Sequence, residues 1–168
     1  MMFDIVLKFD IITKQKGGYM EKIEKLLKEF KNNPKNIDLL FDISNYYFDN
    51  DDYTSAIKFL NKILKIDPEN EEAFLNLGII YGKLALEDIT LDEYWEDHTD
   101  EENLFENAIK NYLNCIEINP KNKTAYNNLA VVYDALDWND KAKEMIEKSL
   151  EIDPNQKELK EMLDELEF

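Results

Sequence analysis

Apolar residues recur near both ends of the chain at the three- and four-residue spacing of one face of an α-helix. Ile23, Leu26, Leu27 and Phe30 share one side of residues 20–33, and Leu159, Met162, Leu163 and Leu166 share one side of residues 157–168. Charged residues fill the other sides, a pattern typical of amphipathic helices. We therefore expect an N-terminal helix over 20–33 and a C-terminal capping helix over 157–168.

Between these helices the sequence repeats itself. Pro34, Pro68, Pro120 and Pro154 are separated by 34, 52 and 34 residues. Because proline cannot continue a helix interior, each marks the end of one repeat and the opening of the next. The spacing predicts three repeats, 37–70, 71–122 and 123–156, and an insertion of 18 residues at 88–105 in the middle one.

Small residues stand at matching places inside each repeat, where paired helices can approach closely. Ser44, Gly78 and Ala130 mark the first helices, and Ala56, Ala108 and Ala142 the second. With Phe74, Leu77 and Tyr81, and with Tyr126, Leu129 and Tyr133, this pattern resembles the tetratricopeptide repeat (TPR) family; Leu40, Ile43 and Tyr47 match it more loosely. The resemblance implies an all-α, right-handed α-solenoid of about three helix-turn-helix repeats with capping helices, forming one domain over residues 20–168.

Residues 1–19 fit this scheme less well. They alternate weakly like a strand and end near Gly17 and Gly18, which break helices. The codons for Lys-Gly-Gly-Tyr-Met are purine-rich and G-rich, as in a prokaryotic ribosome-binding site, so one interpretation is an over-extended gene start with the true start at Met20. The alternative is a short real strand or a membrane-touching arm.

The resemblance also implies a function, because first helices of such arrays line a concave groove that binds proteins. Mapped onto this sequence, the groove face combines apolar side chains with amides. It carries Phe41, Asn45, Phe48, Leu75, Asn76, Ile79, Asn127, Asn128 and Val131. Amides bond both N–H and C=O groups of an extended peptide. We therefore expect a non-enzymatic interaction module, or scaffold, for a peptide or protein.

One subclass of the family grips a C-terminal carboxylate with basic residues and asparagines. Asn45 and Asn76 match the asparagine places, but the basic places hold Phe41, Thr124 and Asn128. The cations are therefore missing, and we do not expect binding of a carboxylate tail.

Composition narrows the choice of partner. The chain carries 37 acidic and 20 basic residues, a net charge of -17, and no arginine. Nucleic-acid affinity depends on cations that displace counterions from phosphates, so we expect no nucleic-acid partner. The apolar runs are far shorter than the roughly 20 residues a bilayer requires, so we expect no membrane partner and a cytoplasmic location.

Candidate chemistry is sparse. Gly-rich phosphate loops and nucleophile motifs are missing, so we expect neither an enzyme nor a cofactor. The single Cys115 aligns by period with Ile63 and Ser149, which predicts a small buried residue. His98 has carboxylates on both sides, and the alternative function is an accessory or ligand-binding domain with a metal site in the acidic insertion.

The insertion itself is strongly acidic. Residues 87–106 contain ten carboxylates and no basic residue, with Tyr94, Trp95, Leu104 and Phe105 between them. Capping boxes at Thr90 and Thr99 predict a short helix near 91–97 and a second helix from about 100 to 118. Two interpretations stay open: a solvated excursion, or an acidic lobe whose exposed aromatic residues, Trp95 among them, dock a basic partner.

Overall fold

The computed structural model describes the backbone of residues 21–91 and 99–166, with side chains except at 88–91 and 99–103. The predicted leader 1–19, the proposed start Met20 and the candidate contact Trp95 lie outside the described residues. So does nearly all of the short helix expected near 91–97.

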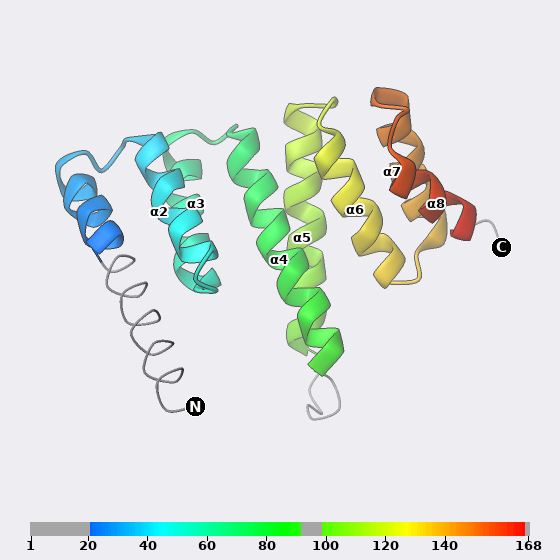
Figure 1. The fold of residues 1–168 in the computed structure, drawn as a ribbon, viewed down its shortest axis with the longest axis horizontal. Helices are drawn as coiled ribbons and strands as arrows, with labels where there is room; N and C mark the ends of the chain where they lie inside the picture. Colours follow the sequence, from blue (N-terminus) through cyan, green and yellow to red (C-terminus); the bar gives the residue numbers. More distant parts are fainter. Residues whose placement is uncertain (1–20, 92–98, 167–168) are drawn as a thin grey trace, which may run out of the picture. The chain divides into compact units, whose positions relative to one another are not determined.

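Every regular element among the described residues is an α-helix (Figure 1). Residues 21–32 are helical. They are followed by α2 (Ile37–Phe48), α3 (Tyr53–Ile66), α4 (Glu71–Leu91), α5 (Thr99–Ile118), α6 (Lys123–Ala135), α7 (Asn139–Ile152) and α8 (Lys157–Leu166). The predicted all-α fold of helix-turn-helix repeats is therefore confirmed.

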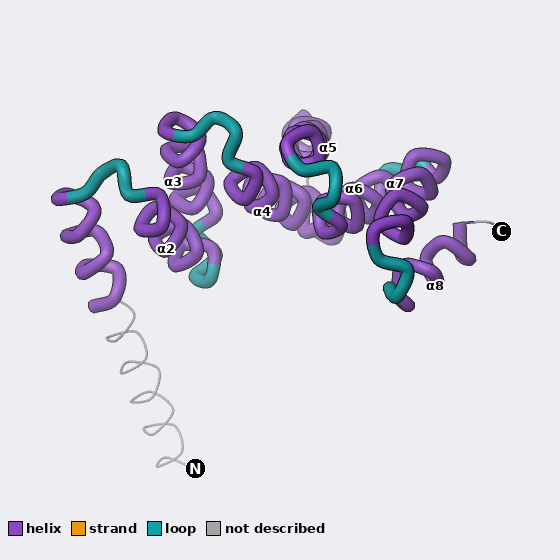
Figure 2. Tube along the Cα trace, turned by 90° about the horizontal axis from the view of Figure 1, so that it is seen from above, coloured by secondary structure: helices purple, strands orange, loops and turns teal. Residues whose placement is uncertain are grey.

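The chain forms two compact units, Met1–Ile66 and Asp67–Phe168. In the first unit α2 and α3 form a hairpin, and in the second unit α4 pairs with α5 and α6 with α7. Figure 2 shows the helices of each pair running side by side.

The first helix of each hairpin is capped in the same way. The side-chain oxygen of Asn36 accepts a hydrogen bond from the Leu39 N–H at 3.1 Å. Asn70 caps α4 through Ala73 at 3.0 Å, and Asn122 caps α6 at 2.9 Å. Such bonds satisfy amide groups that have no partner within the helix. The caps follow Pro34, Pro68 and Pro120 by two residues, so the repeat spacing also places the helix starts.

In the first unit, α2 packs against α3 through buried apolar residues. Leu40, Ile43, Leu60 and Ile63 are fully buried, and the Ser44 hydroxyl donates to the Ala56 carbonyl at 3.1 Å. The Phe30 ring meets Phe59 edge-on, with centroids 5.6 Å apart, so the helix over 21–32 covers part of α3.

The second unit has a continuous core that runs through both of its hairpins. Its centre comprises Ala85, Phe105, Ala108, Tyr112, Cys115, Ala125, Tyr126, Leu129, Ala130, Val132, Tyr133, Ala142, Met145, Ile146 and Leu159. Leu159 belongs to α8, and Met162, Leu163 and Leu166 of the same helix pack partly against this core. The apolar stripe of α8 is therefore used as the sequence pattern indicates.

The insertion lengthens both helices of the middle hairpin. Helices α4 and α5 have 21 and 20 residues, whereas α2 and α3 have 12 and 14. Helix α4 continues to Leu91, so Thr90 does not begin a separate helix. Phe105 is only 5% exposed and packs in the core, which corrects the expectation that it is an exposed docking residue.

Candidate partner-binding groove

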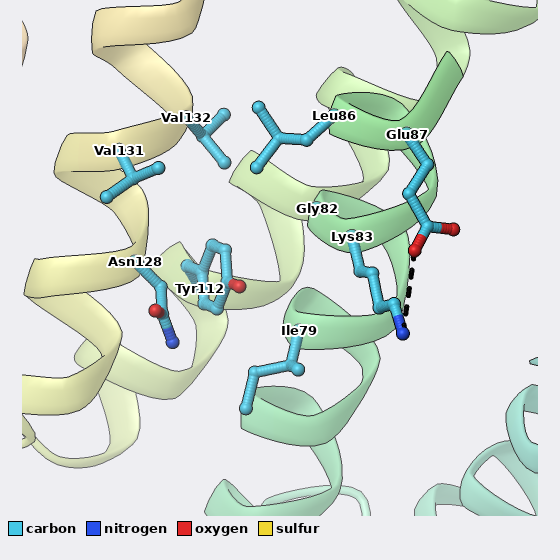
Figure 3. Close-up of a pocket in the computed structure, with 9 residues that line it drawn as sticks. All are labelled: Ile79, Gly82, Lys83, Leu86, Glu87, Tyr112, Asn128, Val131 and Val132. Carbon is cyan, nitrogen blue, oxygen red and sulfur yellow. Dashed lines mark ion pairs between the residues drawn. The ribbon is translucent and has the colours of Figure 1, made fainter. Parts of the chain in front are cut away.

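A pocket of about 440 Å³ opens between α4 and α6 of the second unit (Figure 3). Its lining residues are Ile79, Gly82, Lys83, Leu86 and Glu87 of α4, Tyr112 of α5, and Asn128, Val131 and Val132 of α6. The first helices of two successive repeats thus supply its two walls. Its volume falls in the range of ordinary ligand pockets.

The walls of this pocket are mainly aliphatic. Figure 3 shows Leu86 and Val132 directed toward each other from the two helices. The polar groups are the Asn128 amide, the Tyr112 hydroxyl and an ion pair at 3.5 Å between Lys83 Nζ and Glu87 Oε1. Such a surface suits an apolar side chain together with the polar backbone that carries it.

Tyr112 is the residue of α5 that lines the pocket. The residue is 2% exposed, and its ring passes under α4 at Gly78, where a Cβ atom would lie 2.6 Å from two ring carbons. A tyrosine hydroxyl is neutral at physiological pH, and burial raises the pKa of Tyr112 further above its ordinary value.

Three of the predicted contact residues come together in this pocket. Ile79 lines the α4 wall, and Asn128 and Val131 line the α6 wall. Val131 is 41% exposed, so part of its side chain is available to a ligand in the pocket.

Two further candidates, Leu75 and Asn76, line a second hollow of about 540 Å³ at the start of α4. Its other lining residues are Asp67, Glu69, Asn70, Glu71, Glu72 and Asn122. The Glu71 carboxylate accepts hydrogen bonds from Asn119 at 2.8 Å and from Asn122 at 2.5 Å. Glu71 therefore ties the loop before α6 to α4, while Glu69 and Glu72 are exposed.

Asn127 is engaged inside its own repeat. Its side-chain oxygen accepts a hydrogen bond from the Ser149 hydroxyl, and its amide donates to Gln156 Oε1 at 2.8 Å. Gln156 in turn donates to Ser149 Oγ at 2.9 Å, and Ser149 is fully buried. The sequence prediction treated Asn127 as a groove amide and missed this structural network.

The remaining candidates belong to α2 in the first unit. Asn45 is exposed, and Phe41 and Phe48 are half-buried. The Phe48 ring lies 5.8 Å from that of Tyr53, across the bend between α2 and α3. Part of the Phe48 surface is therefore used within the hairpin.

The pocket also contains residues that the sequence prediction did not include. These are Gly82, Lys83, Leu86, Glu87, Tyr112 and Val132. One signal was present: Tyr112 aligns by period with Leu60 and Ile146, so a hydroxyl stands where both outer repeats are aliphatic.

The part of the chain that the structure describes contains no candidate metal site. No group there combines three or more His, Cys, Asp or Glu side chains around a common point. His98 and most carboxylates of the insertion lie outside the described side chains, so the alternative metal site stays a prediction.

Family models match the sequence over most of the repeat region. A model described as tetratricopeptide repeat matches residues 124–156, and one described as TPR repeat matches 45–84 and 101–137. The chain belongs to the tetratricopeptide repeat family. Tetratricopeptide repeats generally form a non-enzymatic interaction fold, and this chain is a protein-interaction module.

Solved structures of tetratricopeptide repeat proteins resemble the chain. A crystal structure of MamA has a TM-score of 0.69 at 25% identity, covering 91% of this chain and 79% of that chain. TTC0263, a thermophilic TPR protein of Thermus thermophilus, has a TM-score of 0.67 at 18% identity, covering 93% of this chain and 76% of that chain.

The first TPR of Spaghetti (RPAP3), bound to HSP90 peptide SRMEEVD, has a TM-score of 0.63 at 23% identity, covering 78% of this chain and 90% of that chain. No curated protein matches the sequence significantly. Within the described residues, no helix is both long and apolar enough to cross a bilayer.

Proposed function

We propose that this tetratricopeptide repeat protein binds an extended peptide, or a flexible segment of a protein, along the exposed faces of α4 and α6. The observation that carries the proposal is the pocket whose walls come from the first helices of two successive repeats. Ile79, Asn128 and Val131 are its proposed contacts, with Leu75 and Asn76 in the adjoining hollow.

The free energy available from this one pocket favours a partner that extends beyond it. An aliphatic side chain gains about 1.5–3 kcal/mol when fully covered. Association costs an estimated 4–15 kcal/mol in lost freedom, so a single anchor is insufficient. We therefore propose several contacts along one peptide within the second unit, from the pocket to Leu75 and Asn76. Phe41, Asn45 and Phe48 of α2, in the first unit, stay candidates for partner contacts from the sequence alone.

We also propose that the chain is not an enzyme and requires no cofactor. Among the described residues that line the pocket, the polar groups are a neutral phenol, an amide and a Lys83–Glu87 ion pair. Lys83 and Glu87 pair with each other, and these lining groups include no Ser–His or Cys–His pair of the kind typical of nucleophilic catalysis. A basic partner, the absence of nucleic-acid and membrane partners, and a cytoplasmic location remain predictions from the sequence.

A related fold with a bound peptide supports this kind of recognition. The Spaghetti (RPAP3) domain binds HSP90 peptide SRMEEVD, an acidic sequence. In the present chain the places that would hold cations for such a tail carry Phe41, Thr124 and Asn128. We therefore propose a peptide of different charge.

Selection of peptides from a phage-displayed random library, followed by titration with purified variants, tests the proposal. Val131→Ala should weaken the selected peptide by about 1 kcal/mol, or about fivefold, because apolar contact in the pocket is lost. Leu113→Ala is the matched control, because Leu113 lies on α5 and is 44% exposed, against 41% for Val131. Equal binding by both variants would contradict the proposed groove.

A further inference from the structure

The interior of α4 contains two glycines with different surroundings. Glycine destabilises a helix interior relative to alanine, so each position needs a reason. Gly78 has one, since a Cβ atom there would lie 2.6 Å from the Tyr112 ring. At Gly82 a Cβ atom would lie 3.3 Å from Tyr112 Oη and 3.6 Å from Val132 Cγ2. The Tyr112 ring would have to move by a few tenths of an ångström to accommodate it, much less than at Gly78, so packing requires glycine less strictly at position 82.

The absence of a side chain at Gly82 keeps the pocket floor open. Gly82 lies between Ile79, Lys83 and Leu86 on the α4 wall, and Figure 3 shows the Tyr112 hydroxyl directed toward it from α5. A methyl group at this position would fill space between the Tyr112 hydroxyl and Val132.

The outer repeats lack this combination. By the repeat spacing, Gly82 corresponds to Phe48 and Asp134, whereas Tyr112 corresponds to Leu60 and Ile146. Leu60 and Ile146 are fully buried aliphatic residues that bring no hydroxyl. A polar group beside a glycine is thus a property of the middle repeat.

We propose that Gly82 and the Tyr112 hydroxyl form a specificity-determining floor for an aliphatic side chain of a basic peptide. The aliphatic group occupies the space left by Gly82, and Tyr112 Oη hydrogen-bonds the peptide backbone next to it. This inference rests on the proposed function, because it names the occupant of the same groove.

Charge along α4 argues for a basic peptide. Leu75, Asn76, Ile79 and Lys83 follow one another at spacings of one to four residues and line the hollow and the pocket in turn. The hollow adds the exposed carboxylates Glu69 and Glu72 at the start of the helix. Acidic residues suit any helix N-terminus. Glu72, however, precedes Ile79 by seven residues, or about two turns, so both lie on one side of α4. A peptide that fills the pocket and extends toward the start of α4 would pass this carboxylate, which indicates a peptide of opposite charge.

The geometry of α4 also sets a spacing within the peptide. Residues 72 to 79 of an α-helix span about 10 Å at about 1.5 Å per residue. An extended peptide covers that distance with about three residues, at about 3.3 Å each. The peptide should therefore carry lysine or arginine about three positions from its aliphatic anchor.

A defined probe tests this directly. It is a blocked Gly/Ser peptide with one leucine and one lysine three positions apart. Because one anchor supports only weak binding, the probe is titrated into the full chain at concentrations on the order of millimolar and followed by amide NMR shifts, which detect weak binding. We expect shifts at Ile79, Gly82 and Val131, and about tenfold weaker binding when the leucine is replaced by alanine. Replacing the lysine by glutamate should weaken binding about threefold or more, and less so in the Glu69→Gln, Glu72→Gln double variant.

Two variants of the protein test the proposed floor formed by Gly82 and Tyr112. Gly82→Ala should raise the melting temperature, because alanine favours the helix, yet weaken the probe about threefold or more because its methyl group occupies the floor. Tyr112→Phe keeps the ring and should weaken the probe about two- to tenfold through the lost hydrogen bond. Leu113→Ala is the control that should bind normally.

The outcomes separate this inference from the proposed function. If Val131→Ala weakens a library-selected peptide but Gly82→Ala and Tyr112→Phe do not, groove binding stands and the assigned floor is wrong. If the glutamate probe binds as well as the lysine probe, or the lysine probe does not bind while library-selected peptides do, the basic partner is wrong. If none of these variants affects any selected peptide, the proposed function fails as well.

Discussion

Gly78 of α4 lies directly against Tyr112 of α5, so that a Cβ atom at Gly78 would come within 2.6 Å of ring carbons Cδ1 and Cε1. Real Cβ atoms do not approach that closely, and the neighbouring tyrosine is only 2% exposed, with little room to move. The crossing of the middle hairpin therefore depends on pairing the smallest residue with a large one.

Gly78→Ala should consequently lower the free energy of unfolding by about 1–3 kcal/mol, despite the better helix propensity of alanine. Urea denaturation measures the change. The double variant Gly78→Ala, Tyr112→Leu should recover part of the loss, because the outer repeats pair Ser44 with Leu60 and Ala130 with Ile146 at the same places. Simple addition of the two single effects would show that the residues are not coupled.

The Asn127 network makes a second prediction, which differs from the behaviour expected of a residue that only contacts a partner in the groove. Asn127→Ala removes the acceptor of the Ser149 hydroxyl and the donor to Gln156 Oε1, and it should cost about 1–3 kcal/mol in urea denaturation. Asn128→Ala is the matched control on the same helix. Asn128→Ala should change stability little and weaken the binding of a groove peptide. If Asn128→Ala instead destabilised the fold and Asn127→Ala weakened only peptide binding, Asn128 would be the structural residue and Asn127 the contact residue.

Cys115 provides a pH-dependent prediction. Burial, assisted by the charge of Glu71, raises the pKa of the Cys115 thiol from an ordinary value near 9 to about 12. Between these pH values the unfolded chain releases the thiol proton while the folded chain holds it, so rising pH favours unfolding. The stabilisation is complete below about pH 9 and is lost as pH approaches about 12.

The comparison of wild type with Cys115→Ala isolates this effect, because the other titrating groups are common to both. The wild type should lose stability relative to the variant as the pH of the urea titration is raised from about 8 to about 10. A difference that stays constant over this interval would mean that the thiol keeps an ordinary pKa in the folded chain.

The sequence predicted the repeat core well because that core depends on short-range periodicity. Leu40, Ile43, Leu60 and Ile146 recur at helical spacing within their repeats, and all are fully buried. The buried, unreactive position of Cys115 followed from the same alignment of repeats.

The polar features of the site could not be read in the same way. The partners Asn127 and Gln156 are 29 residues apart, and periodicity does not say which amides meet. The alignment of repeats matches Tyr112 with Leu60 and Ile146, yet the surroundings of its hydroxyl include Gly82, which belongs to another helix. The Thr90 capping box predicted a new helix, whereas the backbone of α4 continues through it, because a local cap signal does not exclude continuation of a helix.

The insertion provides the last prediction. Phe105 packs in the core of the second unit with Ala85 near the far end of α4, and Leu104 packs partly against the same core. Phe105→Ala should therefore lower the free energy of unfolding by about 3–5 kcal/mol, the usual cost of truncating a buried phenylalanine. Leu113→Ala on the same helix is the control, and its cost should be under about 1 kcal/mol because Leu113 is 44% exposed.

Deletion of Asp88 to Phe105 extends this test. If the insertion were only a solvated excursion, the shortened chain should have equal or higher stability, because loop closure would cost less. The structure reverses that expectation, since the deletion removes Phe105 and Leu104 and uncovers the part of α4 they pack against. We expect a helical protein that still unfolds cooperatively but at lower urea concentration than wild type, by circular dichroism. Unchanged stability of the deletion, together with a small effect of Phe105→Ala, would show that the lengthened hairpin adds nothing to the core and that the insertion is separable from the repeats after all.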